Sequence, residues 1–156
     1  MGRWPELSHV PHLELSRSIV TSQTADAIFS TLCNLAAAPT WLPNCTALVL
    51  LDGESIGVGA RLRYSYRELR YAGSLLCSVV VFIPGQRIAI AYSDPRVEAS
   101  IDFVIDEREG TTTIHHTVML LPKSLAVRMV ARMLRRGLPA RMDAALRGLE
   151  RAALKA

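Results

Sequence analysis

Five polar side chains that could act on a bound molecule fall on strand faces that are otherwise apolar. They are Arg17, Tyr64, Tyr66, Tyr92 and His116. Successive residues of a strand point to opposite faces, so each of the five shares its face with the apolar residues of its own alternating stretch. A tyrosine on such a face is commonly a core residue whose hydroxyl finds a backbone partner, but the tyrosines gather on neighbouring stretches. The pattern therefore predicts hydrogen-bonding groups turned toward an apolar interior.

Arg17 and His116 are the candidates for catalysis. His115 and His116 are adjacent, so a strand sends them to opposite faces and they cannot bind one metal ion together. The inward one is expected to be His116, whose ordinary pKa near 6.5 would suit proton transfer, although a structural histidine is favoured because no acidic partner is evident. Arg17 keeps its charge, so it must meet an acid, reach the rim of the interior or face a polar ligand group.

The sequence contains no motif for covalent or metal-dependent catalysis. It has no G-x-S-x-G, no glycine-rich phosphate loop and no cluster at metal-ligand spacing. The cysteines at 33, 45 and 77 are odd in number and widely spaced, which indicates free buried thiols. We expect neither a metal nor a cofactor, so any catalysis would rest on acid–base chemistry and positioning.

One long helix is predicted from Pro122 to Ala156 to help position these groups. Its apolar residues recur at three-to-four spacing: Leu125, Met129, Met133, Gly137, Ala140, Ala144 and Leu149. The opposite face carries half of the 18 basic residues of the chain, which must stay in water. Pro139 lacks an amide hydrogen, so a bend or break is expected near Gly137 and Leu138.

Alternating apolar residues predict seven strands that would cover the apolar face of this helix. The first strand is followed by a capped helical unit that runs to Ala38, where Pro39 and Pro43 are expected to break it on either side of Trp41. The connections among the last six strands are short, which requires an antiparallel meander. The predicted strands are 12–20, 45–51, 61–67, 71–82, 87–92, 97–106 and 111–121.

The fold class is therefore α+β, a curled antiparallel sheet of seven strands around a long C-terminal helix, with a short helical unit after the first strand. Residues 1–11 contain two prolines and no periodicity, so they are predicted to be a loose lead-in to a single domain at 12–156. The chain of 156 residues is long enough for one real core.

Composition limits the possible partners. Half of the residues are hydrophobic, but the longest apolar run, Leu75 to Ile83, is far shorter than the ~20 residues of a membrane span. No export signal is evident at the N-terminus, so a cytoplasmic protein is expected, monomeric or homodimeric. The net charge of +4 gathers on the long helix without interleaved aromatic residues, which favours a solvated face over a specific nucleic-acid site.

The order of these elements, with several local patterns, resembles the helix-grip superfamily, which includes START lipid-transfer domains, the birch-pollen-allergen (Bet v 1) fold and polyketide cyclase/dehydrase-like proteins. The patterns are the stretch from Ile19 to Trp41-Leu42-Pro43, then Gly57-Val58-Gly59, Ile83-Pro84-Gly85-Gln86-Arg87-Ile88 and Glu109-Gly110-Thr111-Thr112. The resemblance covers roughly residues 12 to 155 and implies a deep cavity between sheet and long helix. In that family the cavity takes up lipid-like, aromatic or polyketide molecules, in some members with catalysis of cyclisation.

Three functions follow from these observations as hypotheses. The first is binding of a small hydrophobic, aromatic or lipid-like molecule, and the second is an aromatase/cyclase-type enzyme using Arg17, a tyrosine and His116. The third is a peripheral module that meets a membrane or a partner through its basic helix. A buried, partnered ionisable pair in the cavity would favour the enzyme, because binding alone needs none. The residues expected to contact the ligand are Trp41, Tyr64, Tyr66, Tyr92, Phe103, His116, Met129 and Met133.

Overall fold

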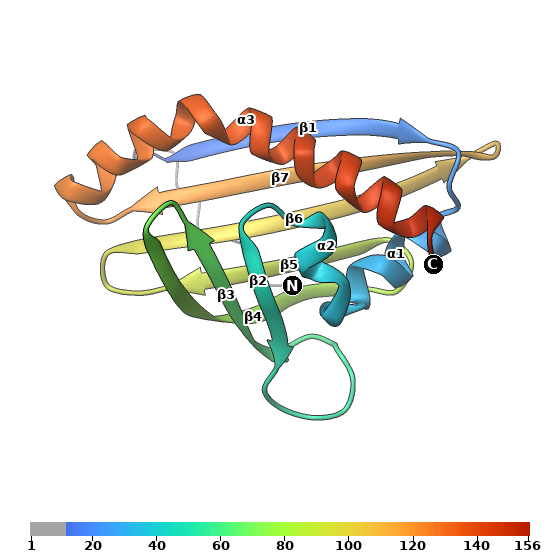
Figure 1. Ribbon diagram of the computed structural model, residues 1–156, viewed down its shortest axis with the longest axis horizontal. Helices are drawn as coiled ribbons and strands as arrows, with labels where there is room; N and C mark the ends of the chain where they lie inside the picture. The colour runs from blue at the N-terminus through green and yellow to red at the C-terminus, as the bar shows by residue number, and fades with distance from the viewer. Residues whose placement is uncertain (1–11) are drawn as a thin grey trace.

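The computed structural model describes residues 12–156, the Leu134 side chain apart, so the predicted lead-in at 1–11 lies outside the described residues. A seven-stranded sheet forms one layer, and a long helix crosses it with the shorter helices grouped toward one end (Figure 1). The predicted α+β class, a curled antiparallel sheet around a long C-terminal helix, is confirmed.

All seven strands pair antiparallel in the order β1-β7-β6-β5-β4-β3-β2, which is the predicted meander with the first strand added beside the last. This order brings Arg17 of β1 directly opposite His116 of β7, and His116 opposite Phe103 of β6. The strands are β1 Leu13–Thr21, β2 Cys45–Leu50, β3 Arg61–Glu68, β4 Tyr71–Ile83, β5 Arg87–Ser93, β6 Val97–Arg108 and β7 Thr111–Pro122.

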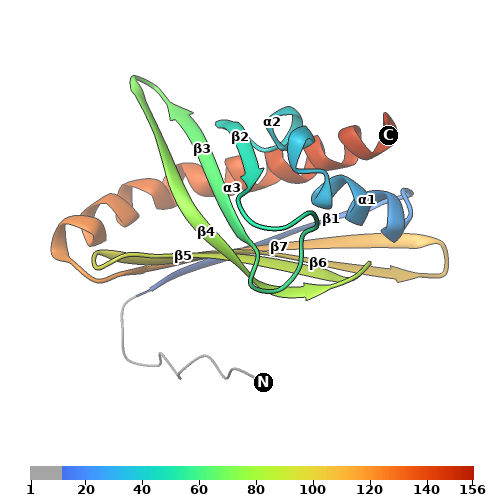
Figure 2. The ribbon, with the colours of Figure 1, turned by 90° about the horizontal axis from the view of Figure 1, so that it is seen from below.

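Two irregularities in strand pairing help to curl the sheet. The register shifts between Val79 and Val81 of β4 and again between Cys45 and Ala47 of β2. An extra residue in one strand bends it and increases its twist. Figure 2 shows the result: β3 and β4 rise from the layer of β5, β6 and β7 toward the side on which the long helix lies. The sheet is therefore concave toward that helix.

The helical unit after β1 consists of α1 (Ala25–Cys33), a 3-10 turn η1 (Leu35–Ala37) and α2 (Ala38–Trp41). Thr24 caps the start of α1, because its hydroxyl accepts a hydrogen bond of 3.2 Å from the Ala27 amide. The predicted break at Pro39 is wrong. Pro39 lies in the first turn of α2, where a missing amide hydrogen leaves no helical bond unmade.

The long helix α3 (Leu125–Leu154) continues through Pro139 without a break. Its axis changes direction between the first turns and the second half, so the proline bends the helix but does not end it (Figure 1). The second half is packed into the core, where Met142, Leu146 and Leu149 are essentially inaccessible to solvent. Leu146 and Leu149 belong to one core cluster with side chains of the sheet, α1 and α2.

The first half of α3 contradicts the predicted apolar face. Met129 and Met133, expected to face the interior, are 69% and 77% exposed, while Ala131 between them is buried. Residues at strict four-residue spacing shift by about 40° per step around a helix of 3.6 residues per turn. The row through Leu125, Met129 and Met133 faces solvent from its first residue, because Leu125 is itself 76% exposed, and the buried row runs instead through Ala131 and Met142.

Candidate functional site

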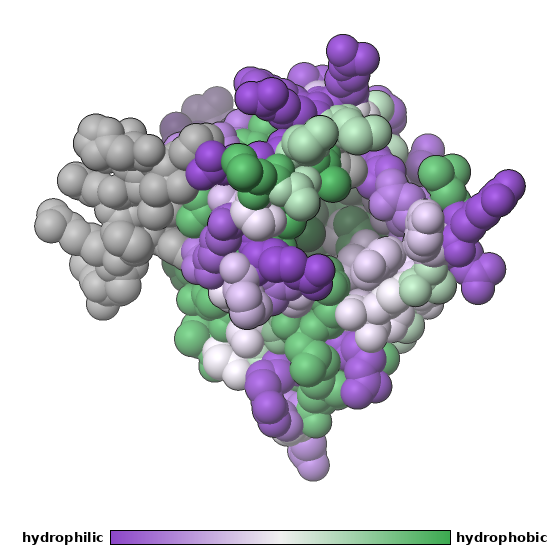
Figure 3. Space-filling model, turned by 90° about the vertical axis from the view of Figure 1, so that its left-hand side faces the viewer, coloured by the Kyte–Doolittle hydropathy of each residue, from purple (hydrophilic) through white to green (hydrophobic). Residues whose placement is uncertain are grey.

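A cavity of about 290 Å³ lies between the concave side of the sheet and the second half of α3. Its walls come from β3, β4, β6, β7, α3 and the segment that follows α2. Figure 3, which faces the left-hand end of Figure 1, shows the surface hollowed between α3 and the β3–β4 hairpin. The lining is mostly apolar: Leu42, Pro43, Tyr64, Tyr66, Leu75, Ile101, Val118, Leu138, Met142 and Ala145, joined by Asn44, Glu68, His116 and Arg141.

A smaller apolar compartment of about 130 Å³ adjoins this cavity. The two share Leu42, Tyr64, Leu75 and Ile101, so the same side chains form the wall between them. Together they reach the size range of small-molecule sites, which begins at roughly 300 Å³. A larger hollow of about 720 Å³ lies between η1 and β2, but it lacks a histidine, a tyrosine or an arginine and offers less specific chemistry.

His116 lies in the cavity wall as the sequence predicts, and only 3% of it is exposed. Its ring stacks on Phe103 with centroids 4.2 Å apart and planes within 3° of parallel. Nδ1 is 3.3 Å from the backbone carbonyl of Asp102, and since a carbonyl only accepts, the hydrogen bond places the proton on Nδ1. That leaves Nε2 as the nitrogen able to accept a hydrogen bond from a molecule in the cavity.

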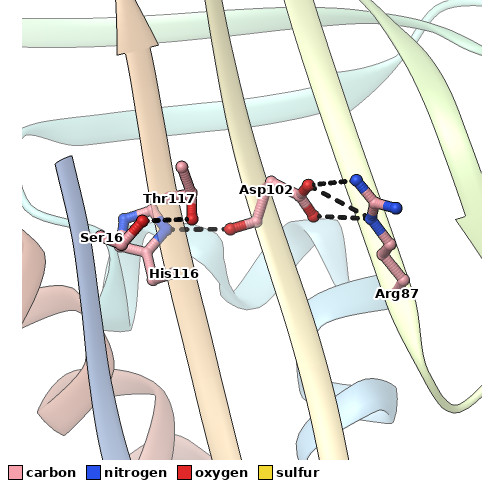
Figure 4. A network of polar contacts seen from close by, with 5 residues as sticks. All are labelled: Ser16, Arg87, Asp102, His116 and Thr117. Atoms are coloured by element: carbon pink, nitrogen blue, oxygen red, sulfur yellow. Dashed lines mark hydrogen bonds and ion pairs between the residues drawn. The ribbon is translucent and has the colours of Figure 1, made fainter. Parts of the chain in front are cut away.

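Burial keeps His116 neutral. Loss of solvent lowers the pKa of His116 below its ordinary value, and the backbone carbonyl of Asp102 offsets this only in part. The carboxylate of Asp102 points away, to the other face of the sheet, where Arg87 donates to it at 2.6 Å (Figure 4). His116 therefore has a backbone partner where an acid–base dyad would have a carboxylate.

Tyr64 and Tyr66 form the wall of the cavity on β3. Their rings stack with centroids 5.9 Å apart. Burial, with Cys45, Cys77 and Glu68 nearby, raises the pKa of Tyr64 to about 12, so its hydroxyl stays protonated and can donate a hydrogen bond. The Tyr66 ring fits over Gly73, where an added Cβ would lie 2.7 Å from the Tyr66 hydroxyl. Because Gly73 has no side chain, the Tyr66 ring can occupy the space above it.

An ion pair between Arg141 of α3 and Glu68 of β3 contributes to the cavity wall. The two side chains are 41% and 37% exposed, so the pair stands at the rim of the cavity and joins the end of β3 to the helix. Arg141 had been predicted on the solvated basic face. Arg141 lines the cavity because it pairs with Glu68, a residue that is far from it in sequence and near it in the fold.

Other predicted site residues lie near the cavity without facing its larger part. The hydroxyl of Tyr92 donates to Asp94 Oδ2 at 2.8 Å, and its ring lines the smaller compartment. Trp41 is buried edge-to-face against Phe103, and among the described residues its Nε1 has no hydrogen-bond partner. Trp41 and Phe103 therefore support the ring of His116 from behind.

Arg17 forms an ion pair with an acid, which is one of the alternatives that the sequence left open. It donates from Nε and Nη2 to the two carboxylate oxygens of Asp143 on α3, at 2.8 and 2.7 Å. This bidentate bond lowers the pKa of Asp143. The pair joins β1 to the middle of α3, and Arg17 is occupied by it.

Several residues that line the cavity were not predicted from the sequence. Leu138, Met142 and Ala145 lie on the buried row of α3, and Asn44 follows α2 with a left-handed φ of 64°. An asparagine between Pro43 and a strand is a turn signal, but it does not tell which face the turn lines.

Across residues 12–156 no group of three or more His, Cys, Asp or Glu side chains is placed to hold a metal ion. No helix in that range is both long and apolar enough to cross a membrane.

Comparison with known proteins confirms the helix-grip fold. An aromatase/cyclase, Zhui, from a Streptomyces species superimposes with a TM-score of 0.76 at 13% identity, covering 93% of this chain and 95% of that one. A START superfamily protein from Mycobacterium smegmatis gives 0.64 at 16% identity, over 89% and 99% of the two chains. Major latex-like protein 151 from Panax ginseng gives 0.69 at 12% identity, over 92% and 98%. No family model and no curated protein matches the sequence.

Proposed function

We propose that this helix-grip protein binds one small, largely apolar or aromatic molecule in the cavity between its sheet and α3. The observation that carries the proposal is the mostly apolar cavity of about 290 Å³, in whose wall two tyrosines and a neutral histidine are the main hydrogen-bonding groups. A hydrophobic site with a few placed polar groups is the usual construction of a small-molecule site.

The polar groups restrict the chemistry of the molecule. Tyr64 keeps its proton and can donate to a carbonyl or hydroxyl oxygen, while Nε2 of His116 can accept from a hydroxyl. The stacked rings of Tyr64 and Tyr66 offer a flat apolar surface beside these groups. An aromatic molecule with one or two phenolic or carbonyl oxygens satisfies all of them, whereas a strongly charged molecule finds only the rim pair Arg141 and Glu68.

Native mass spectrometry of the freshly purified full chain tests this proposal. We expect a fraction of the protein to carry a single small molecule, whose mass and absorbance identify an apolar or aromatic compound. The variant Val118→Phe fills the cavity from β7 and should lose that molecule, while Val80→Phe, an equal substitution at an exposed position of β4, should keep it. If both variants still carry the molecule, it binds outside this cavity, and the proposal is wrong.

A cyclase-type activity is the second candidate, because the free Nε2 of the buried His116 is a possible proton acceptor beside the cavity. Structural neighbours that share the fold include aromatase/cyclases, among them two di-domain proteins of about twice this length. Against it stands the absence of a buried acidic partner for His116 within residues 12–156, so binding is the better-supported function.

Deuterium exchange separates the two candidates. An enzyme that uses His116 as a base would accelerate exchange of the acidic α-protons of a bound aryl 1,3-diketone in heavy water, and His116→Gln would abolish the acceleration. A binding protein would leave the exchange rate of the diketone unchanged or slow it by excluding water.

A further inference from the structure

Two separate elements present exposed apolar side chains at one end of the molecule. In the first half of α3, Leu125, Met129 and Met133 are 69–77% exposed. At the tip of the β3–β4 hairpin, Leu69 of the turn and Tyr71, the first residue of β4, are 94% and 76% exposed. We call these five side chains the apolar rim. Both elements lie at the left-hand end of Figure 1, where Figure 3 shows the hollow between them.

The tip of the β3–β4 hairpin adjoins the cavity. Glu68, which immediately precedes Leu69, is paired with Arg141 of α3 in the cavity wall, so the β3–β4 turn and the helix meet there. Leu69 therefore lies beside a residue of the cavity wall, whereas none of the five side chains of the apolar rim is among the residues that line the cavity.

The stability of the fold does not explain why Leu69 of the apolar rim is a bulky apolar residue. Leu69 adopts a left-handed backbone with φ of 53°, a conformation that costs a residue with a Cβ roughly 1–2 kcal/mol. Because 94% of Leu69 is exposed to solvent, its burial offsets almost none of that free energy. Glycine or asparagine would suit the turn better if it had only to reverse the chain. A bulky apolar residue here instead indicates contact with something outside the protein.

The same end of the molecule is strongly basic. From Gly110 to Met142 the sequence has no acidic residue and six basic ones, of which Lys123 pairs with Glu98 and Arg141 with Glu68. Three of them, Arg128, Arg132 and Arg135, line a single hollow of about 230 Å³ beside the start of β1. Like charges three and four residues apart weaken a helix, and cations near a helix N-terminus oppose its dipole. The arrangement becomes favourable when an anion occupies the space between the guanidinium groups.

We propose that this end of the protein docks onto an anionic membrane surface, with the apolar rim inserted among the lipid headgroups and the arginines of α3 bound to lipid phosphates. An amphipathic helix with a basic side and protruding apolar residues is suited to that interface. The cavity would then open toward the bilayer, so an apolar ligand could pass between the two without crossing water. That passage rests on the proposed function, whereas the docking itself does not.

Charge favours a membrane over a second copy of the chain. A symmetric dimer through the rim would bring the arginines of the two copies together, because a two-fold contact uses the same patch on both sides. The described residues supply no acidic group in α3 before Asp143 to offset them. An anionic bilayer supplies phosphates for the arginines and apolar chains for the rim at the same time.

Vesicle sedimentation with the full chain tests the proposal. We expect binding to vesicles of phosphatidylcholine with about a third of anionic phosphatidylglycerol, weakened by salt, and little binding to phosphatidylcholine alone. Arg132→Gln with Arg135→Gln should weaken binding roughly fivefold for each arginine, or about 25-fold together. Leu69→Ser with Met133→Ser should also release the protein, because insertion of the rim is lost.

The matched control is Arg147→Gln with Arg151→Gln, which removes the same charge from exposed positions in the second half of the same helix and should leave vesicle binding nearly unchanged. Equal loss in both arginine pairs, no effect of the serine pair, or no binding of the wild-type chain would each overturn the proposal. So would a concentration-dependent dimer that Met133→Ser dissolves. Val118→Phe should lose the cavity ligand but still bind vesicles. Ligand carriage and vesicle binding therefore test the cavity proposal and the docking proposal separately.

Discussion

At the scale of single residues, the environment of His116 decides between binding and catalysis. The imidazole is buried, stacked on Phe103 and bonded to the backbone carbonyl of Asp102 on the neighbouring strand β6, while the Asp102 carboxylate is held by Arg87 on the other face. A histidine held in this way stays neutral and offers one acceptor to the cavity. The arrangement suits recognition of a hydroxyl group better than relay of a proton.

The buried neutral state of His116 predicts a pH dependence of stability. Its pKa in the folded protein lies below the unfolded value of about 6.5, so as pH falls through that value the unfolded chain binds a proton that the folded chain excludes. The free energy of unfolding should therefore decrease between about pH 7 and pH 5. Urea unfolding of His116→Gln should show a smaller decrease over this range, and His115→Gln should follow the wild type because it leaves His116 in place. Identical slopes in all three proteins would contradict the assignment.

Tyr64 and Tyr92 make a matched pair for the ligand contact. The Tyr92 hydroxyl is already bonded to Asp94, whereas no hydrogen bond is found for the Tyr64 hydroxyl among the described residues, and it borders the cavity. Tyr64→Phe should weaken binding of naphthol about three- to tenfold, which is the value of one hydrogen bond, and should leave binding of naphthalene unchanged. Tyr92→Phe should alter neither affinity. Calorimetric titration would measure both, and equal losses for naphthol and naphthalene would mean that Tyr64 contributes packing alone.

At the scale of elements, α3 has two halves with different surroundings. The second half lies against α2 so closely that a Cβ at Gly148 would stand 2.6 Å from the Trp41 carbonyl oxygen. The first half leaves Gly137 with nothing within 4 Å of the same added atom. The same helix is thus a core element at one end and a solvent-exposed arm at the other.

Alanine substitutions at these two glycines should have opposite effects. Gly148→Ala forces α3 away from α2 and should cost about 1–3 kcal/mol of unfolding free energy. Gly137→Ala should add about 0.5–1 kcal/mol, because alanine is the better helix former and meets no neighbour. Chemical denaturation of the two variants measures both changes. A stabilising Gly148→Ala would show that the contact between the helices is loose.

Strand positions could be predicted from the sequence to within two residues, because the alternation of apolar residues is sustained and each strand has one buried face. The inward faces of β3 and β7, with Tyr64, Tyr66 and His116, follow from the same alternation. The exposed half of α3 could not be predicted, since Met129 and Met133 satisfy helical spacing without facing the sheet. Arg141 was likewise assigned to solvent, because only the fold reveals its partner Glu68.

At the scale of the whole molecule, the curl of the sheet and the bend of α3 produce a closed core and an open end. The core surrounds Ile28, Leu62, Ile114, Leu146 and Leu149, none of which is exposed. The apolar rim lies toward the other end, and the ion pair between Arg141 and Glu68 stands in the wall of the cavity. The fold is thus stabilised at one end and left open for recognition at the other.

A dye titration tests the central claim, that this open end encloses a single ligand site, most directly. The neutral fluorescent dye N-phenyl-1-naphthylamine should bind the wild-type chain saturably with a stoichiometry near one, because the apolar cavity is expected to hold one molecule of about that size. Val118→Phe should abolish the binding and Val80→Phe should preserve it, with circular dichroism confirming that both variants are folded. Binding that fails to saturate, or that survives Val118→Phe, would contradict the account.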